Sequence, residues 1–382
     1  MDERTRLAKN NYKERLRSLP GVVGVGIGAK RKAGVITGQE AVVIYVRKKL
    51  PLSELAPTAV VPQTLEGGVP TDVIEVGDVR ALPLAPTLVE DHKTTHRPLV
   101  GGVSVSPANV GLSGTIGLPL VYRGAIPCLL SNRHVIAPSE YAAVYQGMPV
   151  TQPSNPDGPG PIVATLLDWV PTNSNGLNEV DAAVAALAEA ATSDILGIGD
   201  YSQLGEPSLG QRVVKSGRTS GVTQGTITGL DATIQINYPR TGLATFEGQI
   251  ILDPMLQPGD SGSAILDYAT RAVVGLGFAA SDQIAVANRM SVVFAKLGLA
   301  LRTKGVPVAE GLASIQGSLV RAWGFDNVAK KWSLYEPGAP LPSLEYLEPG
   351  KGYWVQLSGA ASLTYGPNTW ALSPGWNLIG WI

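Results

Sequence analysis

The sequence contains a single cysteine, Cys128, among 382 residues. One thiol cannot form an intramolecular disulfide, so the chain has no internal cross-link. Its fold must be held together by a hydrophobic core, for which 44% hydrophobic residues provide ample material.

Charged residues are also scarce, at 16% of the chain with a net charge of −1. A near-neutral surface argues against nucleic acid as the main partner, because phosphate binding needs a basic surface. The 45 glycines and 29 prolines follow no period. Together with the low charge, they favour many short strands joined by tight turns over long charged helices.

Long apolar runs are missing as well. Residues 1–21 are charged and amphipathic and lack the apolar stretch of a secretory signal. No window reaches the apolar length of a membrane span. We therefore expect a cytoplasmic protein without a membrane partner, and a non-standard export route stays open.

The first segment, residues 1–98, predicts a small α+β unit followed by a linker. Apolar residues from Leu7 to Leu19 recur at helical spacing, and Pro20 with the following glycine ends the helix. Val- and Ile-rich runs predict strands at 21–31, 41–49 and 71–77. The role of this unit stays open between a structural cap and a pro-segment or regulatory module.

Residues 99–304 are a succession of short Val-, Ile- and Ala-rich runs bounded by Gly, Pro, Asn and Asp. Such spacing predicts a β-sandwich or a pair of β-barrels. One helix is expected at 291–305, with its apolar face formed by Val293, Phe294, Leu297 and Leu301.

The last segment, residues 312–382, holds six of the seven tryptophans. Its short runs predict a separate small β domain, entered through the stretch 305–311. Exposed aromatic residues there would bind a protein or a glycan partner. Tryptophans in a small β domain more often form its core, and this is the interpretation we favour.

Only three histidines are available as a general base. His92 and His96 lie in the polar stretch VEDHKTTHRP, where no third metal ligand is evident, so we expect a solvated linker and no metal site. His134 ends the apolar run of LLSNRHVIA, and a turn there would place its imidazole at the edge of a barrel. On this local pattern alone, a structural histidine whose hydrogen bonds are satisfied within the core is an equal alternative.

Ser261 lies in QPGDSGSAIL, in a tight turn between two glycines and before a buried strand. Such a turn lets the amides of Gly259 and Ser261 point together at one spot, as an oxyanion hole requires. A serine hydroxyl needs a histidine to take its proton, and the histidine needs a buried carboxylate. Asp181 fits that role because it heads the apolar run NEVDAAVAAL, whereas Asp168 and Asp200 lie in more polar surroundings.

Three motifs in the order His, Asp, Ser resemble those of the trypsin/chymotrypsin-like serine proteases: S-N-R-H-V at His134, V-D-A-A-V at Asp181 and P-G-D-S-G-S at Ser261. The variant is most similar to disulfide-free bacterial members, including HtrA-type and streptogrisin-like enzymes. The stretch VVKSGRTSGVTQGTI, residues 213–227, resembles a hairpin in the second barrel of these bacterial members. LPGVVGVGIG and RPLVGGVSV are also similar to the plant narrow-leaf protease and its bacterial relatives.

The resemblance covers residues 99–302 and implies two six-stranded antiparallel β-barrels with a His134, Asp181 and Ser261 triad between them. It implies a serine endopeptidase that acts on protein or peptide substrates without a cofactor or metal. The alternative is an inactive protease-fold scaffold that binds through the C-terminal domain. A homo-oligomer stays open.

Two further expectations follow from this resemblance. Arg97 is followed by Pro98, a poor scissile bond, so activation by a freed N-terminus is not expected and Asp260 must find another donor. The family's substrate pocket would correspond to Met255 at its base, with Gly275, Leu276, Gly277 and Ala285 as walls. None of these residues is acidic, which predicts cleavage after apolar residues.

Overall fold

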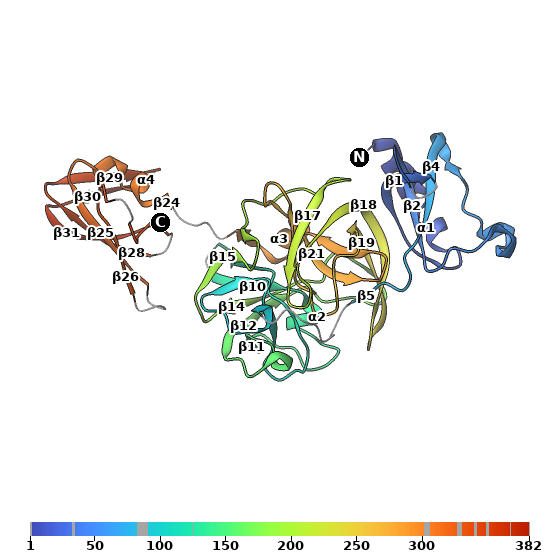
Figure 1. The fold of residues 1–382 in the computed structure, drawn as a ribbon, viewed down its shortest axis with the longest axis horizontal. Coiled ribbons are helices and arrows are strands. Elements are labelled where there is room, and N and C mark those ends of the chain that lie inside the picture. The colour runs from blue at the N-terminus through green and yellow to red at the C-terminus, as the bar shows by residue number, and fades with distance from the viewer. Residues whose placement is uncertain are drawn as a thin grey trace. The chain divides into compact units, whose positions relative to one another are not determined.

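A computed structural model describes residues 2–32, 35–81, 91–124, 126–301, 306–326, 331–339, 342–348, 351–366 and 368–381. The chain forms two compact units, residues 1–301 and 302–382 (Figure 1). Both consist mainly of strands, which confirms the predicted fold class. The expected end of the protease-like region at residue 304 lies outside the described residues.

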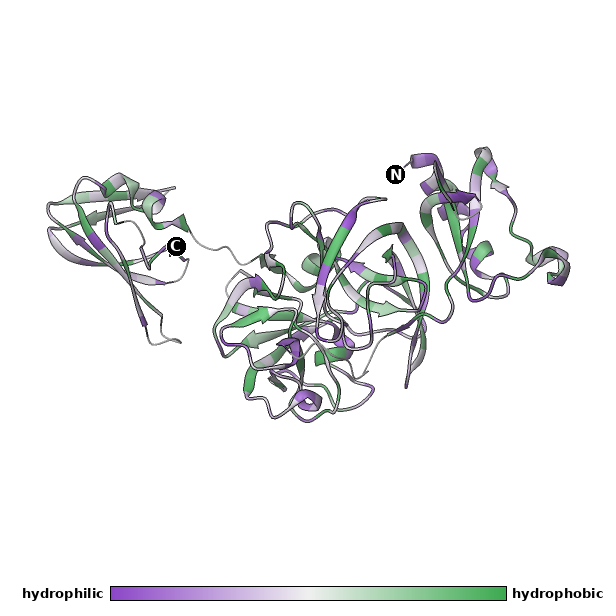
Figure 2. Cartoon of the chain, viewed as in Figure 1, coloured by the Kyte–Doolittle hydropathy of each residue, from purple (hydrophilic) through white to green (hydrophobic). Residues whose placement is uncertain are grey.

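The second barrel of the first unit has the expected six strands. They are β17 (Arg212–Gly217), β18 (Gly221–Tyr238), β19 (Gly242–Leu252), β20 (Ala264–Asp267), β21 (Val273–Ala280) and β22 (Ala285–Arg289). Among the described residues they pair in the order β18-β19-β22-β21-β20-β17 and back to β18, which closes the ring. Its interior is apolar, and Figure 2 shows hydrophobic residues along much of the barrel strands.

The first barrel differs from the expected six strands. Within the described part of the chain its sheet has eight, in the order β23-β9-β10-β14-β12-β11-β7-β8. Their bounds are β7 Ser104–Pro107, β8 Gly114–Thr115, β9 Leu118–Tyr122, β10 Ile126–Ser131, β11 Pro149–Thr151, β12 Ile162–Trp169, β14 Ala183–Leu187 and β23 Leu299–Leu301. An apolar cluster joins the two barrels, since Leu118 and Leu130 of the first pack with Leu266 and Leu276 of the second.

Short elements complete these barrels. They are β6 Leu99–Gly101, β13 Leu177–Asn178, β15 Ala191–Ile195, β16 Gly199–Asp200, the helical turn α2 Arg133–Ile136 and helix α3 Met290–Leu297. Helix α3 is shorter than the sequence predicts, because Gly298 adopts a left-handed conformation with φ of 62° and ends it. Leu301 therefore lies in β23 and not on the helix face.

The N-terminal segment folds as the predicted helix and strands. Its elements are α1 Glu3–Arg17, β1 Val22–Lys32, β2 Val35–Val46, β3 Thr64–Leu65, β4 Val69–Glu75 and β5 Arg80–Ala81. The Asp2 side chain caps α1 by accepting a hydrogen bond from the Arg4 amide. Strand β1 pairs with β18, so this small sheet continues the sheet of the second barrel within the same compact unit.

The second unit is a small β domain around its own core. Its elements are β24 Val306–Pro307, α4 Val308–Gly311, β25 Leu319–Asp326, β26 Lys331–Tyr335, β27 Tyr346–Leu347, β28 Gly352–Leu357, β29 Ala361–Tyr365, β30 Asn368–Leu372 and β31 Gly375–Gly380. Strands β26-β25-β28-β31 form one antiparallel sheet.

The expected core role of the tryptophans is correct for only some of them. Trp381 is buried, and Trp370 stacks on it with ring centroids 5.8 Å apart. Trp332, Trp354 and Trp376 are 50%, 42% and 50% exposed. Because successive side chains of a strand point to opposite faces, β28 buries its other apolar residues and turns Trp354 outward.

Among the described residues, no helix has both the length and the apolar character needed to span a bilayer.

Candidate active site

His134 and Asp181 form a buried pair at the junction of the two barrels. His134 lies in the helical turn α2 after β10, and Asp181 lies two residues before β14. The His134 Nδ1 atom is 2.8 Å from Asp181 Oδ2, and the His134 amide donates to Oδ1 at 3.1 Å. These contacts fix the ring through one nitrogen. The other, Nε2, is buried without a hydrogen-bond partner among the described residues.

Asp181 is completely buried and makes further hydrogen bonds. The Tyr238 hydroxyl donates to Oδ2 at 2.5 Å, and the Asp181 amide donates to Asn288 Oδ1 at 3.0 Å. Burial alone would raise the pKa of the Asp181 carboxyl. The charge and hydrogen bond of His134, with Arg133 and Tyr238, outweigh burial and hold that pKa well below its usual range. Asp181 is therefore a carboxylate.

The other two candidate carboxylates lie elsewhere. Asp168 Oδ2 accepts the Tyr122 hydroxyl at 2.9 Å, and Asp200 Oδ1 accepts the Ser193 hydroxyl at 2.7 Å. Neither contacts His134 in the part of the chain that the structure describes.

Arg133 precedes the histidine and is itself buried. Its guanidinium forms an ion pair with Glu140 and lies 5.8 Å from the centroid of the Tyr238 ring. Arg133 therefore holds two neighbours of the His134–Asp181 pair in place.

Ser261 lies in the turn before β20, and two glycines shape this turn. Gly259 and Gly262 have φ of 98° and 97°, a region that favours glycine. A Cβ at Gly262 would lie 2.2 Å from the carbonyl oxygen of Thr115, so only glycine permits this approach of the two barrels. The Ser261 carbonyl accepts the Thr115 amide at 2.8 Å, which joins the turn to the first barrel.

Several backbone groups of this turn are hydrogen-bonded to neighbouring segments. The Asp260, Gly262 and Ser263 amides donate to carbonyl oxygens at 2.8, 2.9 and 3.0 Å. The Gly259 carbonyl accepts the Thr115 hydroxyl at 2.9 Å. The Gly259 amide makes no hydrogen bond to any described residue.

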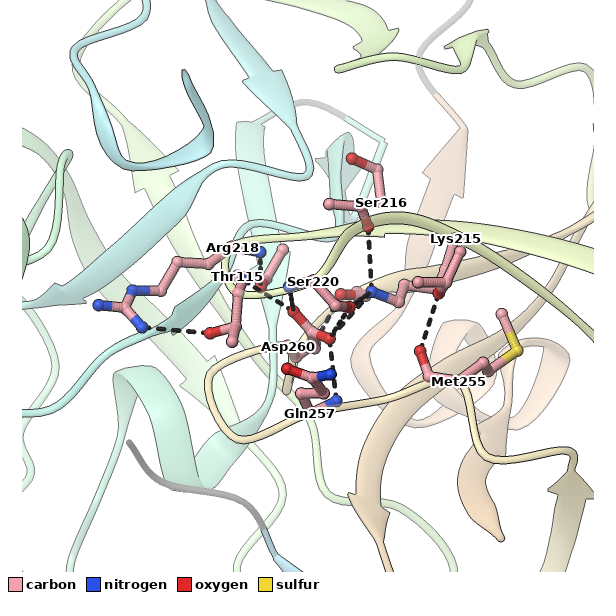
Figure 3. A network of polar contacts seen from close by, with 12 residues as sticks. Thr115, Lys215, Ser216, Arg218, Ser220, Met255, Gln257 and Asp260 are labelled. Atoms are coloured by element: carbon pink, nitrogen blue, oxygen red, sulfur yellow. Dashed lines mark hydrogen bonds and ion pairs between the residues drawn. The ribbon is translucent and has the colours of Figure 1, made fainter. Parts of the chain in front are cut away.

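Asp260 finds its cation in Lys215, as Figure 3 shows. Both side chains are fully buried, and Lys215 Nζ lies 2.9 Å from Asp260 Oδ2. The carboxylate also accepts the Thr219, Ser220 and Gln257 amides at 2.8, 3.1 and 2.9 Å. Burial would raise the pKa of Asp260, but Lys215 and the hydrogen bonds from the Ser220 hydroxyl and the Gln257 amide lower it. The ion pair thus ties hairpin β17–β18 to the turn that carries Ser261.

The expected pocket residues are only partly brought together. Met255 and Ala285 lie in one buried apolar cluster, and Gly277 approaches Leu256. Met255 lines a cavity of about 490 Å³. A neighbouring cavity of about 750 Å³ lies between segments 256–258 and 280–283.

The remaining predicted wall residues are Gly275 and Leu276. Leu276 is fully buried between the barrels, and neither residue lines either cavity. Ala280 and Asp282 line the larger cavity. The register of β21 against β22 shifts between Gly277 and Ala279, and motif spacing does not reveal such a bulge.

The two remaining histidines lie outside this site. His96 Nε2 lies 2.8 Å from the Asp91 carbonyl oxygen. His92 contradicts the expected solvated linker, because it is buried and its Nε2 lies 2.9 Å from the Ser216 hydroxyl. Burial lowers the pKa of His92. This position locks the linker onto β17.

Comparison with known proteins points to one group of enzymes. The chain is 37% identical to streptogrisin-A from Streptomyces griseus over 71 residues, which are 19% of this chain and 23% of streptogrisin-A. The chain is similar to bacterial chymotrypsin-like serine proteases. This confirms the resemblance predicted from the sequence, although the match spans less than a quarter of streptogrisin-A. No protein-family model matches the chain.

Solved structures with a related arrangement include a Nocardiopsis protease, with 18% identity over 53% of this chain and 98% of that protein, at a TM-score of 0.41. A glutamic acid specific serine protease that uses a histidine triad in substrate binding matches at 17% identity, covering 53% of this chain and all of that protein, also at 0.41. Deg5 matches at 17% identity over 50% of this chain and 84% of Deg5, at 0.32.

Sequence reasoning missed two supporting residues. Tyr238 contacts Asp181 from the end of β18, 57 positions away, and nothing in its local sequence marks it. Lys215 could have been found from the sequence. It is a lone charge next to Val213 and Val214 in a buried strand, and such a charge needs a buried partner.

Proposed function

We propose that this chain is a serine endopeptidase whose catalytic groups are Ser261, His134 and Asp181. The observation that carries the proposal is the buried His134–Asp181 pair, whose free Nε2 is available to a hydroxyl. The locked turn with Gly259 and Ser261 supplies the second requirement, a nucleophile beside preset amide donors. The similarity to streptogrisin-A supports the same chemistry.

In the proposed mechanism, His134 Nε2 takes the proton of Ser261 as its oxygen attacks the scissile carbonyl carbon. The carbonyl oxygen becomes an oxyanion that the Gly259 and Ser261 amides stabilise. Asp181 holds the tautomer and stabilises the imidazolium. His134 then gives its proton to the leaving amine, and water releases the acyl group by the same steps. No residue in this scheme requires a cofactor.

For the substrate we propose a peptide with an apolar residue before the cleaved bond. Met255, Leu256, Ala280 and Ala285 form one buried apolar cluster next to the two cavities. Asp282 lines both cavities but is exposed to solvent, so it does not create a buried negative charge at their base. A buried Lys or Arg side chain would lack a partner at that apolar base.

The test is kcat/KM on a fluorogenic peptide for substituted proteins. Ser261→Ala, His134→Ala and Asp181→Asn should each reduce kcat by about 10⁴ or more, since replacing the triad aspartate of trypsin with asparagine has an effect of that size. His96→Ala and Asp168→Asn are matched controls and should retain near-full activity. Loss of activity in Asp168→Asn with retention in Asp181→Asn would overturn the carboxylate assignment.

The alternative function, an inactive scaffold that binds through the C-terminal domain, rests on the exposed aromatic residues of that domain. Trp332, Trp354 and Trp376 lie on strands of one sheet, and exposed apolar groups of this size mark binding surfaces. The alternative predicts no hydrolysis by a correctly folded protein. Hydrolysis that depends on Ser261 would exclude it.

A further inference from the structure

Strand β5 of the N-terminal segment lies along the edge of β21 that adjoins Ser261. Ala81 pairs with Ala279 and Arg80 pairs with Ala280 in antiparallel register. On its other side, β5 pairs with β18 in parallel, at Arg80 and Asn237. The two-residue strand therefore fills the space between two barrel strands.

This edge of β21 is otherwise suited to receive an extended peptide. Among the described residues, the pairing of β20 with β21 ends at Leu276, so the later part of β21 has β5 as its strand partner on this side. Phe278, which precedes the paired segment, places its carbonyl oxygen 3.4 Å from the Ser261 hydroxyl oxygen. A peptide added to such an edge gains main-chain hydrogen bonds and would lie beside the nucleophile.

The side chains of the segment hold it in this place. Val76, Val79 and Ala81 are only 0%, 3% and 2% exposed, and they pack in one apolar cluster with Phe278 and Ala279. The Asn237 amide donates to the Val79 carbonyl oxygen at 3.0 Å.

Ala81 also reaches the catalytic histidine. It lines a small cavity together with His134 and Tyr238. The segment thus spans from the N-terminal sheet to the catalytic groups.

The strand is tethered next to its site. Only residues 76–79 separate β5 from β4, and the N-terminal sheet is joined to the second barrel through β1 and β18. A strand held this way has a high effective concentration at the β21 edge, without being removed from the chain.

We propose that β5 is an autoinhibitory strand, which a peptide substrate must displace from the edge of β21 before it can be cleaved. The proposal rests on the proposed protease function and names its regulation. Displacement is reversible, because local opening of a two-residue strand leaves the β1–β18 pairing intact. A strand that covers the edge in about nine of ten molecules would weaken the binding of an extended ligand about tenfold.

The test compares two covalent probes of Ser261 in the full chain. A small alkyl fluorophosphonate does not need the β21 edge, whereas a tetrapeptide diphenyl phosphonate ending in leucine does. Val79→Asp places a charge in the apolar cluster and should release β5. We expect it to raise the labelling rate of the tetrapeptide probe about tenfold and to leave that of the small probe unchanged.

Val69→Asp is the matched control. Val69 in β4 is 5% exposed, and its apolar cluster contains no residue of β21. The same substitution there should change neither rate. If the tetrapeptide probe labelled the parent and Val79→Asp at equal rates, with both proteins folded, the autoinhibitory role would be overturned. Failure of the small probe to label Ser261 would instead overturn the protease function.

Amide hydrogen exchange of the unsubstituted chain gives a second readout that does not depend on a variant folding. Covalent attachment of the tetrapeptide probe should speed the exchange of residues 79–81, while residues 69–75 exchange as before. Unchanged protection of residues 79–81 with the probe in place would contradict displacement.

Discussion

Replacing Lys215 with methionine should both destabilise the protein and impair the catalytic turn. Methionine keeps much of the volume of the lysine stem but removes the charge. The Asp260 carboxylate, fully buried, would then lose the cation 2.9 Å away and keep only its hydrogen bonds from the 257 and 219–220 segments. An uncompensated buried charge of this kind costs about 3–5 kcal/mol.

The loss should reach catalysis because Asp260 lies between the two proposed oxyanion donors, Gly259 and Ser261. A carboxylate that moves to find a partner will displace these amides. Loss of one oxyanion donor costs about 10²–10³ in kcat, so a similar loss is expected in Lys215→Met. The penalty should shrink at mildly acidic pH, because without Lys215 the pKa of Asp260 rises and protonation removes the unpaired charge.

The assay has two parts, with Lys9→Met as a matched control. The free energy of unfolding in urea is measured for each substitution in a Ser261→Ala background, which avoids self-cleavage. The value of kcat is measured for the same substitutions with Ser261 intact. Lys9 is 3% exposed and pairs with Asp231 at 2.9 Å, but Asp231 is 29% exposed, so the control should lose less stability and no activity. Adding Asp260→Asn to Lys215→Met should recover part of the stability.

The reasoning would be refuted if the free energy of unfolding of Lys215→Met lay within about 0.5 kcal/mol of the parent value and its kcat were unchanged. A change of that size is typical of substitutions at exposed positions.

Three other outcomes are expected. Gly259→Ala should lower kcat by about 10² or more, because the added Cβ would lie 2.3 Å from Thr219 Oγ1 and residue 259 has a positive φ. The control Gly21→Ala should not affect kcat, because Gly21, with φ of 78°, has open space around it. A peptide library should be cut after Leu, Met, Val or Phe, and a profile dominated by Lys or Arg that disappears in Asp282→Asn would contradict the apolar pocket. The free energy of unfolding of the Ser261→Ala protein should fall as pH drops below about 4, because the lowered pKa values of Asp181 and Asp260 mean that the unfolded chain binds more protons. Urea unfolding at pH 3 and pH 6 measures this difference, and equal values would contradict it.

Two of the proposed catalytic groups lie in distinctive local patterns of the sequence. Ser261 lies between glycines, and Asp181 heads an apolar run where an unpaired charge would be costly. The mainly β fold followed from the same short apolar runs.

Other features depend on long-range geometry that local patterns do not carry. The need for another donor beside Asp260 was foreseen, but that donor, Lys215, lies 45 positions away on another strand. The register irregularity of β21 after Gly277 is another feature that motif spacing does not reveal. His92 is buried through a contact with Ser216 that its polar surroundings in the sequence conceal.

The tryptophans show a different limit. Composition predicts that many aromatic residues in a small domain form its core, yet the alternation of β28 buries Tyr353, Val355 and Leu357 and exposes Trp354. The alternation of side chains along the strand predicted which residues are buried better than the residue type did.

The central claim is that Ser261 is an activated nucleophile, and covalent labelling tests it most directly. The Ser261 oxygen should attack the phosphorus of an alkyl fluorophosphonate, with fluoride leaving and the proton passing to His134. Intact mass and peptide mapping should then show one adduct per chain, on Ser261. The adduct should be absent from Ser261→Ala and strongly reduced in His134→Ala. No adduct on the folded parent protein, or an adduct on another residue, would contradict the assignment of this chain as a serine endopeptidase.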